Sequence, residues 1–178
     1  DLLYGVELLK PMKKVSWGFT SRTAISPTAS GSPKYFEFLQ NPSFKVSVAL
    51  KSENTDNEFE EFLHAIKEGE SIYTPVLGWH NCPANLEYIS EGSFSSLKEG
   101  GFETRGFAEP QKHNVEITDA NFRIGFDKLP TFQDDSFWNK PESYRNVIYP
   151  DFPNSMKLKG EYYEYQSNGK PQEQWWLM

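Results

Sequence analysis

Three histidines and one cysteine are the residues best suited to metal or nucleophilic chemistry in this 178-residue chain. His80 and Cys82 could place two ligands near a metal ion, but a structural zinc site needs four well-spaced ligands. No CxxC or HxxxH pattern supplies the others. His64 falls off the apolar stripe of a predicted helix, and His113 lies in a polar segment without an obvious partner. The sequence therefore predicts neither a metal site nor a cofactor.

Acidic side chains are the second candidates for chemistry. The glutamates at 58, 60, 61 and 68 lie on the predicted helix, where they are interpreted as its solvated face. Asp134 and Asp135 could form the carboxylate pair of a glycosidase or a calcium site. They lack the DxDxDG ligand spacing of a calcium loop. Their adjacency in sequence also says nothing of the distance between carboxylates that a glycosidase needs. No G-x-S-x-G or GxxxxGK[ST] motif occurs. We therefore expect no enzyme, and a glycosidase is only the third-ranked hypothesis.

Charge and cysteine content exclude several classes of protein. The formal net charge of -7 argues against nucleic-acid binding, which requires a basic surface, and against adhesion to anionic lipid. Cys82 is the only cysteine, so no internal disulfide can form, which favours a reducing compartment or an assembly held by packing. No apolar run approaches the ~20 residues of a membrane helix, and no signal peptide is visible. We expect no membrane insertion.

The elements that position these residues are predicted to be mostly strands. Aromatic residues make up 16% of the chain, and 12 prolines and 12 glycines separate them, which is typical of a β-dominated domain. An Asn168-Gly169 pair predicts a hairpin turn with both central residues at positive φ. Long loops are predicted at 21–33 and, as an irregular excursion, at 129–153. Periodicity predicts strands at 2–9, 15–20, 35–38, 44–50, 71–77, 86–89, 102–107, 115–117, 122–126, 156–165 and 172–178.

One amphipathic helix is predicted at about 55–68. Thr55 and Glu58 have the spacing of a capping box, and Gly69 stands where a C-terminal cap would lie. The apolar side chains follow at i, i+3, i+4 and i+7, namely Phe59, Phe62, Leu63 and Ile66. Such a face must pack on something, so we predict that the helix covers one face of a sheet. The fold class predicted for residues 1–178 is a single mainly β domain, a β-barrel or β-sandwich with one flanking helix.

Aromatic residues in predicted loops and near the last residue could do one of three things. They could fill the core of their own chain, stack on sugars as in a carbohydrate-binding β-sandwich, or bury against a neighbouring subunit. Trp175 and Trp176 point to opposite faces if their segment is a strand, so one of them covers a second layer or contacts a partner. The stacking platforms of the carbohydrate hypothesis, which ranks second, would be Trp138, Tyr144, Trp175 or Trp176.

The succession of strand 44–50, helix 59–66, Gly69 and strand 72–75 resembles a segment of the tail-tip proteins of long-tailed bacteriophages. It is similar to the minor tail proteins of lambda-like phages and to the amino-terminal domain of distal tail proteins. The segment 15–22 is similar to the strand and loop that precede it in those families. The resemblance covers about the first 80 residues as a pattern of residue classes and finds no counterpart in the second half.

The resemblance implies a split β-barrel or sandwich with one helix, assembled into a ring around the tail channel, and a structural protein without catalytic residues. The leading hypothesis is therefore a tail-tip subunit of a virion, made in the host cytoplasm. Its partners would be identical subunits and other tail proteins, and possibly a glycan. The predicted interface residues are Arg22, Trp138, Tyr144, Tyr149, Trp175 and Trp176.

Overall fold

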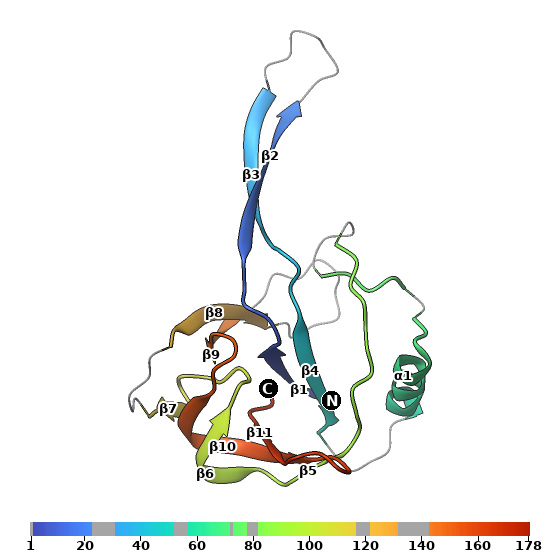
Figure 1. The fold of residues 1–178 in the computed structure, drawn as a ribbon, viewed down its shortest axis with the longest axis vertical. Coiled ribbons are helices and arrows are strands. Elements are labelled where there is room, and N and C mark those ends of the chain that lie inside the picture. The colour runs from blue at the N-terminus through green and yellow to red at the C-terminus, as the bar shows by residue number, and fades with distance from the viewer. Residues whose placement is uncertain are drawn as a thin grey trace.

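The computed structural model describes residues 2–22, 31–51, 57–71, 73–77, 82–116, 122–131 and 143–178. These residues form a mainly β structure with one helix, which confirms the predicted fold class. The sheets do not close into a barrel. Figure 1 shows a β body, a long two-stranded projection that rises from it, and a helix at one side.

The longest strand, β10 (Met156–Gln166), organises the largest sheet. Strands β5 (Ser93–Phe94) and β6 (Lys98–Thr104) follow one of its edges. Strands β7 (His113–Val115) and β11 (Glu173–Trp175) follow the other edge, and all four are antiparallel to β10. The alternation of buried and exposed side chains at 156–159 is the pattern of a strand with one face in the core.

Two strand pairs complete the body. Strand β1 (Leu2–Leu8) pairs with β4 (Phe44–Leu50), and Tyr4 of β1 exchanges two backbone hydrogen bonds with Met178. Strand β8 (Ile124–Thr131) pairs with β9 (Ser143–Pro150). Ile148 of β9 exchanges two backbone hydrogen bonds with Ala108, so the segment after β6 joins this hairpin to the sheet.

The core lies between the β10 sheet and the β8–β9 hairpin. One cluster of buried apolar residues is Phe102, Ala108, Ile148, Met156 and Leu158. A second contains Val147, Trp176 and Met178, with Phe107, Leu129 and Tyr163 packed around it. Side chains from the last residues of the sequence therefore fill the centre of the body.

Several sequence predictions are corrected by the structure. The described residues of 71–77 and residues 86–89 form no strand, except that Val76 makes a single bridge with Pro83. The predicted irregular excursion 129–153 is partly regular, because β8 reaches Thr131 and β9 covers 143–150.

The turn after β10 also differs from the predicted turn. Lys170 N–H donates to the Ser167 carbonyl, and only Gly169 has positive φ, at 75°, which matches a type II turn rather than type I′.

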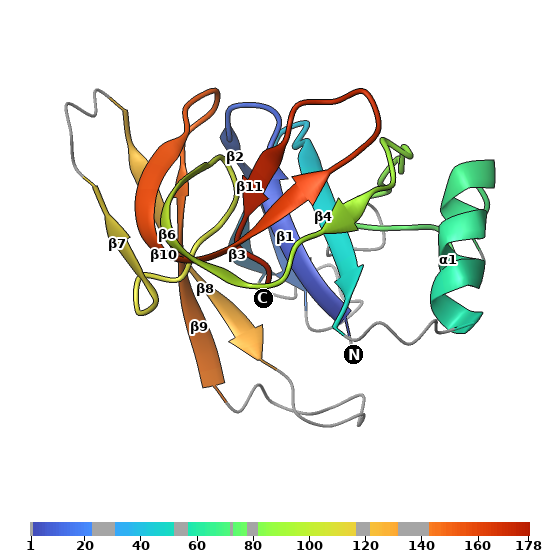
Figure 2. The same ribbon diagram turned by 90° about the horizontal axis from the view of Figure 1, so that it is seen from below.

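The helix α1 (Asn57–Glu68) confirms the predicted element, and Gly69 ends it with φ of 71°. Thr55 lies outside the described residues. The prediction that α1 covers a sheet face is wrong, since none of its residues is buried. Lys67 of α1 contacts the rest of the chain, since its Nζ lies 2.5 Å from Glu91 and over the ring of Tyr88. Figure 2 shows the helix standing beside the body.

Candidate interaction surfaces

The two-stranded projection, called the arm here, consists of β2 (Lys14–Arg22) and β3 (Gly31–Leu39). The strands pair antiparallel along their whole length, from Lys14 opposite Leu39 to Arg22 opposite Gly31. Among the described strands, no other pairs with either of them. Figure 1 shows the arm extending away from the body, and a backbone hydrogen bond of 2.7 Å from Gln40 to Lys13 closes its base.

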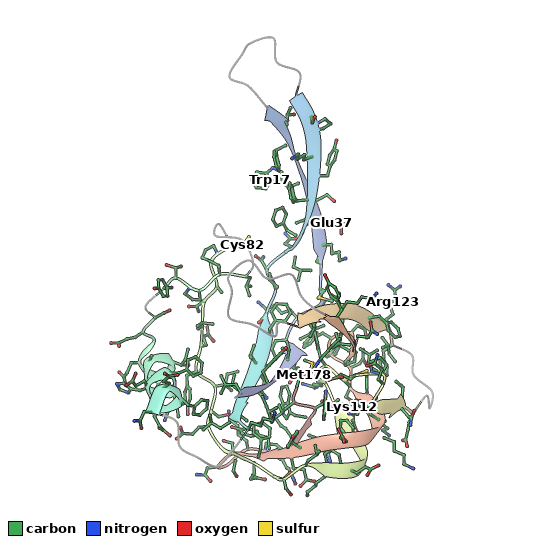
Figure 3. The ribbon with its side chains drawn as sticks, turned by 180° about the vertical axis from the view of Figure 1, so that it is seen from behind. Trp17, Glu37, Cys82, Lys112, Arg123 and Met178 are labelled. Atoms are coloured by element: carbon green, nitrogen blue, oxygen red, sulfur yellow. The ribbon has the colours of Figure 1, made fainter. Side chains whose placement is uncertain are left out.

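One face of the arm is aromatic. Alternation and register place five apolar side chains on it, namely Val15, Trp17, Phe19, Phe36 and Phe38. The rings of Phe19 and Phe36 stack with centroids 5.2 Å apart, and Trp17 lies 6.2 Å from Phe38. Trp17 is nevertheless 61% exposed, and Figure 3 shows side chains extending from the arm into open space. A contiguous exposed apolar surface of this kind marks an interaction site.

The other face of the arm is more polar. Lys14 and Glu37 form an exposed ion pair at 3.7 Å. Tyr35 lies over Gly18, where a Cβ atom would come within 2.8 Å of the ring, so a side chain at Gly18 would displace the tyrosine. The arm thus has two chemically distinct faces and no core of its own. An isolated two-stranded hairpin is marginally stable in water, so a surface that covered the arm would stabilise it.

A second set of exposed apolar side chains, called the flank here, lies in the described residues of 57–91. Phe62 of α1 is 48% exposed, and its ring lies 6.3 Å from that of Phe59. The segment after the helix exposes further large apolar side chains, which are Tyr73, Val76, Leu77, Leu86, Tyr88 and Ile89. A 12-residue helix with no buried residue is itself marginal in water. The flank is therefore also an element that gains stability when covered.

A buried polar cluster surrounds His113, for which sequence reasoning predicted no partner. His113 Nε2 lies 2.8 Å from the Glu161 carbonyl oxygen, and Nδ1 lies 2.8 Å from the Glu109 carbonyl oxygen. The Glu109 carboxylate accepts hydrogen bonds from Arg145 at 3.4 Å and from the Trp176 indole at 3.3 Å. Within the described residues, no buried side-chain nitrogen or oxygen lacks a partner. The polar atoms of the cluster find their hydrogen-bond partners within the chain itself, which is typical of a structural network.

A second polar network joins β1, β4 and β11. Lys45 Nζ lies 2.6 Å from Glu173 and 5.1 Å from the centroid of the Trp175 ring. Glu7, paired in register with Lys45, is buried and lies 3.6 Å from Arg105. Burial raises the pKa of the Glu7 carboxyl, while Lys45 and Arg105 oppose that shift. These contacts tie three strands together at the centre of the body.

For Trp175 and Trp176, the structure supports core packing rather than contact with a partner or a sugar. Their exposed fractions are 2% and 5%. The Trp175 ring packs against Gly5 and Gly106, where added Cβ atoms would come within 2.9 Å and 3.2 Å of it. Trp176 lies on the other side, against His113. The two rings do point to opposite faces, and both faces are covered by the chain itself.

The other predicted interface residues have different environments. Tyr144 in β9 is 58% exposed and remains available to a partner. Tyr149 is half-buried and stacks on Phe107 with centroids 4.8 Å apart; burial and the nearby Asp127 carboxylate raise the pKa of its phenol. Arg22 is the last residue of β2 at the outer end of the arm. Trp138 lies outside the described residues, as do His80, Asp134 and Asp135.

Sequence reasoning missed the aromatic face of the arm. Both strands were predicted, but not their pairing with each other. The available signal was the alternation of Val15, Trp17 and Phe19 on one side of the long turn-rich segment, and of Phe36 and Phe38 on the other. Antiparallel pairing across that segment places all five side chains on one face.

Comparison with protein-family models, with curated proteins and with solved structures finds no match to this chain. Among the described residues, no three His, Cys, Asp or Glu side chains form a group that could hold a metal ion. No helix in the described part of the chain is both long and apolar enough to cross a membrane.

Proposed function

We propose that this chain is a structural subunit of a phage or phage-like tail tip, which assembles with identical copies into a ring or adaptor. The observation that carries the proposal is the arm, a two-stranded hairpin with four aromatic rings on one exposed face. If the arm is buried on a neighbouring subunit, its length and its aromatic composition are accounted for. The resemblance of the first 80 or so residues to tail-tip proteins supplies the biological context.

The experiment compares the whole chain with a variant in which residues 14–39 are replaced by an Asn-Gly linker. Lys13 and Gln40 are already joined by a backbone hydrogen bond, so the excision leaves the ends of the body adjacent. We expect the whole chain to form discrete oligomers by sedimentation velocity and rings by negative-stain microscopy. The excised variant should remain monomeric and keep the far-ultraviolet spectrum of the β body.

The controls separate assembly from folding. A melting temperature of the excised variant within a few degrees of the parent would show that the body does not depend on the arm. A whole chain that sediments as a monomer at all soluble concentrations would contradict the proposal.

A further inference from the structure

The arm and the flank are two of the apolar surfaces left uncovered in the described chain, and their sequences carry opposite charge. Residues 10–39 contain five basic residues and one acidic residue, a net charge of +4. Residues 57–91 contain seven glutamates and one lysine, a net charge of -6. In a chain whose net charge is -7, this separation creates one basic and one strongly acidic surface.

We infer that the aromatic face of the arm docks on the flank of a second copy of this chain, in a head-to-tail contact. This inference rests on the proposed assembly function and names its interface. Arm against arm would bring two basic surfaces together, and flank against flank two acidic ones. Like charges that face each other across an interface oppose association, whereas opposite charges favour association and register. Arm against flank is the one pairing of these surfaces that charge favours.

The charged side chains are placed to take part. Lys34 is exposed and lies opposite Phe19 on the aromatic face itself, and Lys10 and Lys13 are exposed at the base of the arm. On the flank, Glu58 lies one helical turn before Phe62, so a carboxylate borders the exposed ring. The one flank lysine, Lys67, is already paired with Glu91.

The contact would also stabilise both the arm and α1. The arm lacks a core, and α1 has no buried residue. Each element is marginal when exposed, and each would supply the apolar cover that the other needs. Because the arm and the flank are different surfaces of one chain, the contact is heterologous, and repetition generates a closed ring or an open filament.

The test uses two variants of the whole chain, Trp17→Glu on the arm and Phe62→Glu on the flank. Each variant keeps one half of the contact intact. We expect each alone to be monomeric at concentrations at least roughly tenfold above those at which the parent assembles. Mixed in equal amounts, they should form a 1:1 dimer, in which the arm of the Phe62→Glu chain occupies the flank of the Trp17→Glu chain. Further growth is blocked because both remaining surfaces are altered.

Matched controls place the same added charge elsewhere on each element. Thr20→Glu alters the other face of the arm, and His64→Glu alters an exposed position off the apolar stripe of α1. Both should assemble like the parent. Phe62→Glu makes the flank still more acidic, so its loss of assembly would report lost apolar packing rather than lost attraction.

Other outcomes overturn the inference. If Phe62→Glu alone assembles like the parent, the flank is not the partner of the arm. If the mixture stays monomeric, the contact is not head-to-tail. If either control is monomeric, the effect does not depend on the named faces. If the unmodified chain assembles but one of these three results is found, the arm–flank contact is wrong and the proposed assembly function stands. If the unmodified chain is itself monomeric, both the contact and the proposed function are wrong.

Discussion

Trp17 and Trp175 are the same amino acid in opposite environments. Trp17 is 61% exposed on the arm, and Trp175 is 2% exposed between Gly5 and Gly106. The indole N–H of Trp175 also donates to Glu173 at 2.9 Å, so its polar atom is satisfied. Both residues occur in segments with strand periodicity, and only the contacts around them decide whether the ring is core or surface.

We expect Trp175→Ala to lower the free energy of unfolding by about 3–5 kcal/mol, because it removes a buried ring and leaves a cavity. Trp17→Ala should cost less than about 1 kcal/mol in the monomer, as surface substitutions do. Urea denaturation of both variants at a concentration that keeps the chain monomeric checks the difference. Equal losses for the two would contradict the assignment of Trp175 to the core.

Glu7 makes stability depend on pH. Its pKa is raised in the folded chain, chiefly by burial, so the folded state holds the proton more tightly than the unfolded state. The contribution of Glu7 to the free energy of unfolding is therefore greatest below the ordinary pKa of 4.5. This contribution is lost as pH rises through the raised pKa of the folded state. Glu7→Gln removes this titration, so the parent should lose stability relative to the variant as pH rises above 4.5.

The measurement is the difference in unfolding free energy between parent and Glu7→Gln at each pH, which cancels the titration of other groups. A pH-independent difference for Glu7→Gln would show that the buried carboxyl is not coupled to folding.

At the scale of elements, the arm and α1 are held differently from the strands of the body. Strand β10 has partners on both edges, and its side chains Met156 and Leu158 are fully buried. Among the described strands, those of the arm pair only with each other, and Lys67 of α1 contacts Glu91 and Tyr88. Local opening therefore costs far less in the arm and the helix than in β10.

Amide hydrogen exchange tests this hierarchy directly. In the monomer, we expect the amides of β2 and β3 to exchange at least ~100-fold faster than the central amides of β10, because opening the arm exposes no core. In the assembled protein, the arm amides should become protected while β10 changes little. Arm amides as slow as those of β10 in the monomer would mean that the arm is stable without a partner.

At the scale of the whole molecule, the separation of charge between arm and flank would make the proposed assembly sensitive to salt. The Debye length falls from about 10 Å at 0.1 M ionic strength to about 3 Å at 1 M, so attraction between the two surfaces is screened at high salt. Association that is steered by charge is therefore slower at high salt. The charges of the arm and the flank therefore act on the rate of assembly more than on the packing of the rings.

We expect the association rate of the whole chain, followed by light scattering, to fall at least ~10-fold between low and high salt. Lys34→Glu should reduce both the rate and its dependence on salt, because it reverses a charge on the aromatic face. Lys157→Glu, on β10 of the body, is the matched control. An association rate that rises with salt would contradict a charge-steered contact.

The candidate surfaces were partly accessible from sequence. Alternation at Val15, Trp17 and Phe19 predicts a strand, and the stripe of α1 predicts an amphipathic helix, since both periodicities are local. The exposure of these faces was not predictable. A half-apolar strand and a half-apolar helix normally pack on the rest of their own chain, and no local pattern distinguishes that outcome from an uncovered surface.

The sequence by itself determined the positions of the helix and most strands, the absence of an internal disulfide and the acidic balance of charge. These follow from side-chain period, turn residues and residue counts. Only the tertiary structure decided that β1 pairs with β4 across the arm, that Trp175 and Trp176 are core, and that α1 covers no sheet. Strand pairing and burial depend on contacts between residues far apart in sequence, which local periodicity does not encode.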